Sequence, residues 1–233
     1  MKTETKKIIG ILGGMGPEST AIFYHEIILQ CQKQYGAQLD EDYPEIFMYN
    51  LPIPDVVEGI KNKAETLNSL VKGAKKIESI GVDFMVMPCN TTHYFFKDMK
   101  KEISIPFLSI VEETAKKIKE KGFKKIGLLA TKTTVENKIY NPEFEEYGIE
   151  LVIPEEQDKV NKVIMNILAG NKLETDKQEL KQVINSLKDK GAEAIVIGCT
   201  DIPILLKAED VEMAVFDTVE ILAESTVRYA IEP

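Results

Sequence analysis

The chain has 233 residues, of which 44% are hydrophobic and 29% are charged, and its formal net charge at pH 7 is −9. This length and composition suit one large domain or two smaller ones with a sizeable core. The excess of negative charge argues against a nucleic-acid-binding face, and no apolar run approaches the length that spans a membrane. We therefore expect no nucleic-acid partner and no membrane association.

The cysteines and the N-terminus indicate the compartment. Three cysteines without a CxxC pair or clustered histidines predict neither a disulfide framework nor a metal site. The apolar stretch after the basic N-terminus ends at Gly13, which is too short for a secretion signal. We expect reduced thiols, a cytoplasmic protein and no bound metal.

Strands and helices are predicted to alternate along the whole chain. Apolar runs of strand length occupy residues 8–12, 46–49, 84–87, 107–110, 126–129, 150–153, 195–197 and 213–216. Helical patterns occupy residues 67–79, 112–121, 160–168, 178–188 and 219–230. Such alternation indicates parallel βαβ units, so we predict an α/β fold with helices on both faces of its sheets.

The last four predicted strands correspond in order and spacing to the first four. The third strand of each set leads into a cysteine, Cys89 in the first set and Cys199 in the second. A repeat of this length indicates a duplicated domain rather than a solenoid. We predict two pseudo-symmetric parallel-sheet domains related by internal duplication, with the active site in the cleft between them.

The loop after the first strand is rich in glycine, and Pro17 suits the first turn of a helix that follows it. Glycines let backbone N–H groups approach an anion at a helix N-terminus. A dinucleotide would also require an acidic residue at the end of the second strand, where the chain has Asn50 instead. We therefore favour a small carboxylate here, and we count Met15, Gly16 and Asn50 as candidate substrate-binding residues.

The corresponding loop of the second half begins with Thr131. Its hydroxyl has two interpretations, an ordinary helix N-cap or a ligand of a substrate carboxylate.

Cys89 and Cys199 stand at the polar ends of two predicted buried strands, where ligands of parallel sheets bind. A helix that begins at such a point lowers the pKa of a thiol. Two thiols that face each other across one substrate suit the transfer of a proton from one face of a carbon to the other. Small hydrogen-bonding residues follow both cysteines: Asn90, Thr91 and Thr92 after the first, Thr200 and Asp201 after the second.

A histidine offers a competing interpretation. His93 lies four residues after Cys89 and so shares its side of a helix, which would suit a Cys–His hydrolase. That interpretation leaves Cys199 without a role. Cys31, within a helical pattern, is predicted to pack in the core.

Together these segments resemble the cofactor-independent aspartate/glutamate racemases. The resemblance covers essentially the whole chain, and it rests on residues 13–19, 87–93, 127–131, 198–201 and 216–218. It implies two α/β domains, one formed by residues 1–100 and 212–233, with the C-terminal helix packing back, and one formed by residues 101–211. It further implies an amino-acid substrate, a homodimer and no cofactor.

The mechanism implied by this resemblance uses both thiols. One thiolate of the Cys89–Cys199 pair removes the Cα proton, while the opposite thiol donates a proton to the other face. The pair would titrate as one coupled system with one resting thiolate. Preorganised donors around the substrate carboxylate would stabilise the carbanion, and the candidates are the Gly14–Gly16 loop, Asn90, Thr91, Thr131 and Thr200.

Two positions depart from the family pattern. Asp201 stands where members often carry glutamate, and it would orient Cys199 or meet the substrate ammonium. Aspartate-specific members carry an arginine just after an Ile-Pro-Asp segment, whereas here Val56 and Val57 follow residues 53–55. Lys162 is the candidate substitute, as a point charge. Aspartate is the expected substrate, with glutamate, both, or a less polar amino acid as alternatives.

Two other functions stay open. One is an isomerase or decarboxylase of the same superfamily that acts on a dicarboxylate such as maleate, with one cysteine adding covalently and the other protonating. The other is a non-catalytic protein that binds a small ligand between two α/β halves.

Overall fold

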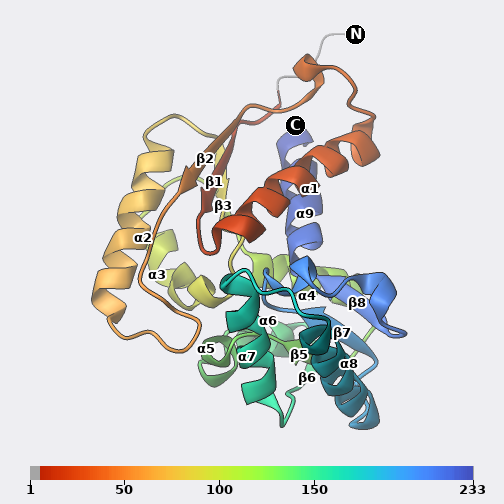
Figure 1. The fold of residues 1–233 in the computed structure, drawn as a ribbon. Helices are drawn as coiled ribbons and strands as arrows, with labels where there is room; N and C mark the ends of the chain where they lie inside the picture. The colour runs from red at the N-terminus through yellow and green to blue at the C-terminus, as the bar shows by residue number, and fades with distance from the viewer. Residues whose placement is uncertain (1–5, 233) are drawn as a thin grey trace.

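The computed structural model describes residues 6–232, and it contains two four-stranded sheets in which every pairing is parallel (Figure 1). The first sheet has the order β2-β1-β3-β4, with β1 Ile9–Gly13, β2 Ile46–Asn50, β3 Phe84–Val86 and β4 Phe107–Leu108. The second has the order β6-β5-β7-β8, with β5 Lys125–Leu129, β6 Glu150–Val152, β7 Ala194–Ile197 and β8 Ala214–Asp217. The matching orders confirm the predicted fold class of two pseudo-symmetric parallel sheets.

The helices follow the predicted alternation. They are α1 Pro17–Tyr35, α2 Lys63–Glu78, α3 Phe96–Lys101, α4 Ile110–Lys121, α5 Lys132–Glu136, α6 Asn141–Glu146, α7 Gln157–Leu168, α8 Glu174–Asp189 and α9 Thr218–Ile231. Three strands are shorter than predicted, β3, β4 and β6, and β4 is shortened most. It ends where Ser109 caps α4 by accepting the backbone N–H of Glu112. In the part of the chain that is described, no helix is long and apolar enough to cross a membrane.

Matching glycines let one helix of each half lie close to its central strand. A Cβ at Gly10 of β1 would lie 2.5 Å from Cγ2 of Ile77 in α2. A Cβ at Gly127 of β5 would lie 3.0 Å from Cδ1 of Leu187 in α8. A real Cβ rarely makes contacts this short, so both halves use glycine at corresponding places for the same close approach.

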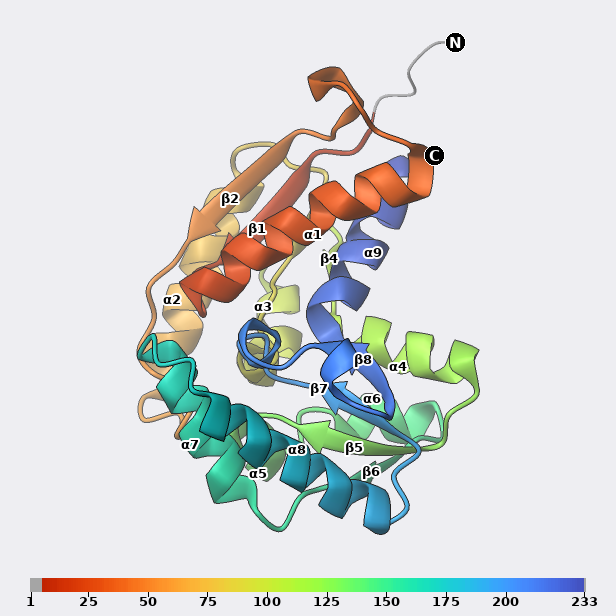
Figure 2. The ribbon, with the colours of Figure 1, turned by 45° about the vertical axis from the view of Figure 1, so that its right-hand side comes forward.

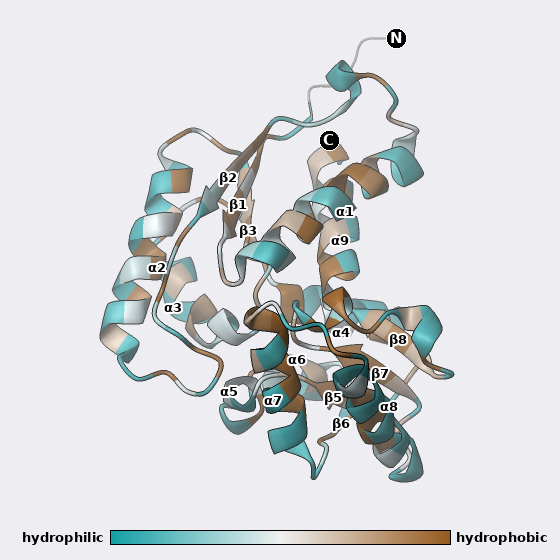
Figure 3. Ribbon diagram, viewed as in Figure 1, coloured by the Kyte–Doolittle hydropathy of each residue, from teal (hydrophilic) through white to brown (hydrophobic). Residues whose placement is uncertain are grey.

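The last helix ties the two halves together. From the end of β8, α9 runs back toward the first sheet and packs against α1 and α4 (Figure 2). It carries both hydrophilic and hydrophobic residues, as α2 and α8 do (Figure 3). Because α9 is mostly buried, one apolar cluster includes Ile9 and Val86 of the first sheet and Ile126 and Val196 of the second.

The two sheets end at residues that differ from the predicted domain limits. β4 pairs with β3 and β8 pairs with β7, so the first sheet ends at Leu108 and the second at Asp217. The domain limits at residues 100/101 and 211/212 stay a prediction, and sheet pairing alone would shift both of them toward the C-terminus.

Candidate active site

The two cysteine loops meet at one small cavity of about 140 Å³. Cys89 follows β3 and Cys199 follows β7, so each lies beyond the carboxyl end of a central strand. Drug-sized ligands occupy cavities of roughly 300–1,000 Å³, so this volume suits a much smaller molecule and argues against a nucleotide. The lining comes from both halves: Gly14, Met15, Gly16, Ile53, Pro54, Asp55, Val56, Val57, Cys89, Asn90, Thr91, Thr131, Leu168, Cys199, Thr200 and Asp201.

Most of the residues that the sequence predicted for the site lie at this cavity, and three do not. Asn50 is exposed at the end of β2. Thr92 is buried, and its hydroxyl donates to the backbone carbonyl of Cys89 at 3.2 Å. The ammonium of Lys162 is exposed and pairs with Glu179 at 3.0 Å. This geometry gives no support to direct substrate contacts by these three side chains.

Three buried hydroxyls from the two halves form a cluster beside the cavity. Thr91 Oγ1 lies 3.0 Å from Thr131 Oγ1 and 3.2 Å from Thr134 Oγ1, and the last two lie 2.9 Å apart. Thr131 also caps α5 by accepting the backbone N–H of Thr134 at 3.1 Å. The position of Thr131 therefore fits both interpretations, because the residue caps a helix and also lines the cavity. Because a hydroxyl rotates freely, each of the two that line the cavity is able to donate to a ligand oxygen.

A second network holds Asn90 and includes a residue that the sequence did not mark. The hydroxyl of Tyr140 donates to Asn90 Oδ1 at 2.6 Å, and Asn90 Nδ2 donates to Thr218 Oγ1 at 3.0 Å. The Thr218 hydroxyl in turn donates to the carbonyl of Ile197 at 2.9 Å, at the end of the strand that leads to Cys199. Tyr140 lies between α5 and α6, in a segment without strand or helix periodicity, so no pattern points to it.

Burial dominates the electrostatics of both thiols. It raises the pKa of Cys89, and hydrogen bonds from the side chain and backbone of Thr92 offset part of this effect. Burial and then the negative charge of Asp201 raise the pKa of Cys199 well above its usual value. The expected lowering of the thiol pKa is therefore not found. Each cysteine leads into a short 3₁₀ turn, and loss of water outweighs the backbone dipoles there.

Asp201 links the second cysteine loop to the glycine loop of the first half. Its Oδ2 lies 3.9 Å from Cys199 Sγ, so the thiol donates to the carboxylate. Burial raises the pKa of Asp201, while a hydrogen bond from Ser19 lowers it. A Cβ at Gly16 would lie 3.2 Å from Asp201 Oδ1, so a glycine there lets the loop approach the carboxylate closely.

His93 supports the first cysteine loop from behind. Its Nε2 accepts the backbone N–H of Ile110 at 3.2 Å, so its Nδ1 carries the proton and donates to the carbonyl of Cys89 at 2.7 Å. Burial lowers the pKa of His93 to about 4, which keeps the ring neutral near pH 7. Both ring nitrogens are thus committed to the backbone, and the Cys–His hydrolase interpretation loses its base.

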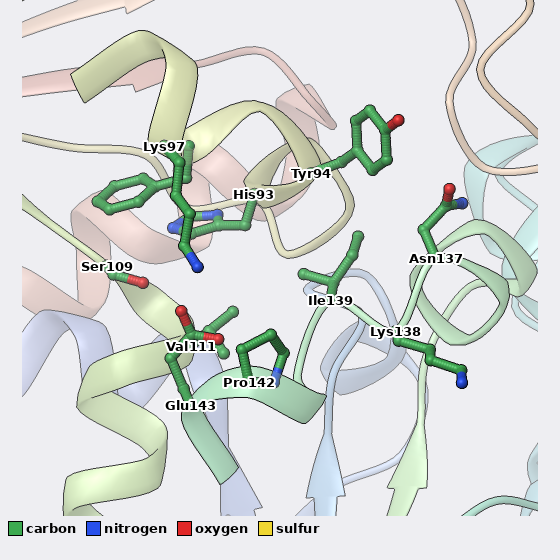
Figure 4. A pocket seen from close by; sticks show the side chains of 11 residues that line it. His93, Tyr94, Lys97, Ser109, Val111, Asn137, Lys138, Ile139, Pro142 and Glu143 are labelled. Atoms are coloured by element: carbon green, nitrogen blue, oxygen red, sulfur yellow. The ribbon is translucent and has the colours of Figure 1, made fainter. Parts of the chain in front are cut away.

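A second hollow, of about 210 Å³, lies between the α3 and α6 regions (Figure 4). His93 lines it, and the charged ends of Lys97 and Glu143 point into it. Neither cysteine belongs to its lining, so it is separate from the cavity described above. Within residues 6–232, no group of three His, Cys, Asp or Glu side chains is placed to hold a metal ion.

Comparison with known proteins shows one consistent likeness. The profile of the Asp/Glu/hydantoin racemase family matches residues 12–226. The broad specificity amino-acid racemase RacX of Bacillus subtilis is 36% identical over 221 residues, which are 94% of this chain and 96% of that protein. An aspartate racemase homologue from Pyrococcus horikoshii has a TM-score of 0.82 at 31% identity, covering 97% of this chain and 100% of its own. The Picrophilus torridus aspartate racemase has a TM-score of 0.81 at 34% identity, covering 96% of this chain and 94% of its own.

Proposed function

Because the chain belongs to the Asp/Glu/hydantoin racemase family, we propose that it is a cofactor-independent amino-acid racemase whose opposed proton carriers are Cys89 and Cys199. The main support is that two thiols, one from each half of the fold, line the same small cavity. A charge on Cys89 would also raise the pKa of Cys199, as expected for two thiols that share one cavity.

The reaction has two balanced steps. A thiolate on one side takes the Cα proton, which leaves its bonding electron pair on the carbon as a carbanion. The opposite thiol then gives its proton to the other face of that carbon and becomes the thiolate. One enantiomer has become the other, and the two cysteines have exchanged protonation states, so the reverse direction uses the same groups in the opposite roles.

The substrate itself favours the charged form of a cysteine. Protein groups alone favour neutral thiols at both positions, because both are buried. A zwitterionic amino acid brings an ammonium group, and an opposite charge within a few ångströms lowers the pKa of a thiol. Asp201 is the partner for that ammonium group, since its carboxylate lines the cavity beside Cys199.

Three hydroxyls of the cavity lining serve the other end of the substrate. Thr91, Thr131 and Thr200 line the cavity and are able to donate to the α-carboxylate. These groups are fixed before the substrate enters, so they stabilise the charge that spreads into the carboxylate when the carbanion forms. Asn90 has less hydrogen-bonding capacity left for the substrate, because its side-chain amide is already bonded to Tyr140 and Thr218.

The family alone leaves the substrate open. Aspartate is expected from the resemblance, and the Picrophilus torridus relative is named an aspartate racemase, whereas RacX is named for broad specificity. Aspartate thus remains one member of a panel to be tested. The homodimer and the cytoplasmic location stay predictions.

The test is solvent exchange at Cα. The protein is incubated in D₂O with each L-amino acid, and loss of the Cα proton is followed by NMR together with the appearance of the D-enantiomer. Cys89→Ser and Cys199→Ser should each lower racemisation at least about a thousandfold. Cys31→Ser is the matched control, because Cys31 is buried in α1 and does not line the cavity.

Two outcomes would reject the proposal. Full racemisation in either single variant of the cavity cysteines would exclude the two-thiol scheme. Turnover of maleate without exchange at any amino acid would indicate the dicarboxylate isomerase instead.

A further inference from the structure

The cavity has two parts with different chemistry. Around the cysteines lie the hydroxyls of Thr91, Thr131 and Thr200 and the carboxylate of Asp201. If the proposed function holds, on which this inference rests, that part receives the α-carboxylate and the α-ammonium group that all amino acids share. The rest of the cavity is then left for the side chain.

The side-chain part is almost wholly apolar. It is formed by residues 53–57 together with Met15 and Leu168. Among these described residues, Asp55 alone carries a polar side chain. Its Oδ1 accepts the backbone N–H of Val57 at 3.1 Å, which fixes the carboxylate on this segment.

The charges of the whole lining have one sign. Two carboxylates, Asp55 and Asp201, line the cavity, and among the described lining residues none is a lysine, an arginine or a histidine. The α-ammonium group of a substrate compensates one of these charges. A side-chain carboxylate would meet the other without a cation to pair with, and both repulsion and loss of water disfavour that position.

Lysines elsewhere do not supply the missing cation in this arrangement. Lys162 pairs with Glu179 at 3.0 Å, and Lys172 pairs with Glu18. Neither lines the cavity.

We propose that the substrates are amino acids whose side chains carry no negative charge, and that aspartate and glutamate are disfavoured. The carbon atoms of the side chain pack against Val56, Val57 and Leu168. An amide or a cationic group at the end of the side chain meets the carboxylate of Asp55, which accepts a hydrogen bond or pairs with the charge.

Isosteric substrate pairs isolate the effect of charge. Asparagine and aspartate have nearly the same size and shape, as do glutamine and glutamate, so a difference within a pair reports the carboxylate alone. In the D₂O assay with the purified full-length protein, kcat/KM for exchange should be at least tenfold higher for the amide member of at least one pair.

Two variants test the assignment of the side-chain part of the cavity. Asp55→Asn keeps the oxygen that accepts the N–H of Val57 and removes the charge, so it should raise exchange with aspartate and glutamate severalfold relative to the amides. Val57→Arg adds a cation to the same side-chain part of the cavity and should raise exchange with aspartate and glutamate further. Val57→Met is the control, because it lengthens the side chain without adding charge and should leave the acid-to-amide ratio near that of the wild type.

The outcomes separate this inference from the proposed function. Equal or faster exchange with aspartate and glutamate in the wild type would overturn the inference while leaving a racemase in place. Exchange with no amino acid at all would overturn both. An acid-to-amide ratio that neither Asp55→Asn nor Val57→Arg changes would also overturn the assignment of the side-chain part.

Discussion

The two cysteine loops occupy corresponding places in the two halves, yet their side chains differ at every following position. Both loops leave the third strand of a sheet with the same strand order. Both cysteines are buried to a similar degree, with 6% of the residue exposed at Cys89 and 5% at Cys199. In order, Asn90, Thr91, Thr92 and His93 follow the first cysteine, whereas Thr200, Asp201, Ile202 and Pro203 follow the second.

This difference shows that a duplicated backbone need not duplicate the electrostatics. The first loop offers its thiol neutral hydrogen-bonding groups of Thr91 and Thr92, and the second places a carboxylate 3.9 Å from its sulfur. Burial raises the pKa of both thiols, and the negative charge of Asp201 adds to both: it comes directly after burial at Cys199, whereas at Cys89 hydrogen bonds from Thr92, which lower the pKa, have larger effects. Cys199 is therefore the thiol that holds its proton more strongly, and Cys89 is the easier one to ionise.

Removal of the Asp201 charge should have the largest effect, both on catalysis and on the difference in pKa between the two thiols. Asp201→Asn should lower kcat/KM about a hundredfold, because the substrate ammonium loses a charge-assisted hydrogen bond beside the reacting carbon. The same change should speed alkylation of Cys199 by iodoacetamide in the absence of substrate, because the pKa of Cys199 falls. Quenched time points analysed by peptide mass spectrometry give the rate at each cysteine.

A longer acid provides the control for this variant. Asp201→Glu keeps the charge, so the alkylation rate of Cys199 should stay close to that of the wild type. If Cys199 reacts no faster in Asp201→Asn than in the wild type, the carboxylate is not what separates the two thiols.

The anchoring of the first loop by His93 should appear in the pH dependence of stability. Burial lowers the pKa of His93 from 6.5 to about 4, so the unfolded chain binds the proton more readily. The stability that the neutral ring contributes is present above about pH 6.5 and is lost as the pH falls toward 4. The loss should be about 2 kcal/mol between pH 7 and pH 4.5, measured by urea unfolding.

Asp217 titrates with the opposite sign, so the variant must be compared with the wild type at each pH. Burial raises the pKa of Asp217 from 3.8 to about 7, and its contribution to stability is therefore lost as the pH rises toward 7. His93→Gln should remove only the dependence that is due to His93. His25→Gln, on the exposed face of α1, is the matched control. An unchanged pH slope in His93→Gln would show that the ring is not buried in its neutral form.

The order of thiol modification in the wild type should show a smaller effect. Near pH 8, Cys89 should be alkylated about tenfold faster than Cys199, because the thiolate is the reactive form and its fraction is larger where the pKa is lower. Both rates should rise with pH. Faster labelling of Cys199 than of Cys89 would reverse the assignment of the easier base.

The cysteine pair and the sheets were predictable because both leave local marks in the sequence. Each strand is a short apolar run, and each cysteine follows such a run with hydrogen-bonding residues after it. Their nearness in sequence to these cysteines explains why four predicted residues line the cavity: Asn90, Thr91, Thr200 and Asp201.

Other features depend on tertiary structure, which spacing does not reveal. The sequence does not show that Lys162 faces Glu179 of α8 rather than the cavity, because its direction depends on how α7 is rotated about its own axis. The thiol pKa was predicted with the wrong sign, because burial arises only when the two halves meet. Tyr140 was missed for the same reason, since its partner Asn90 lies 50 residues away.

Tyr140 lies between the two loops, and its loss should give the smallest of the effects. Its hydroxyl bonds Asn90 beside Cys89, and a Cβ at Gly198, beside Cys199, would lie 3.3 Å from that hydroxyl. We expect Tyr140→Phe to lower kcat about fivefold with little change in KM, since the loops shift while the lining residues remain. The unfilled acceptor on Asn90 should cost about 1–2 kcal/mol of stability. A Phe144→Leu variant removes the ring that packs edge-to-face against Tyr140 but keeps the hydrogen bond, so it should lower stability without lowering kcat. An equal loss of kcat in both variants would assign Tyr140 to packing alone, and a selective loss in Tyr140→Phe would show that its hydroxyl sets the relation between the two cysteine loops.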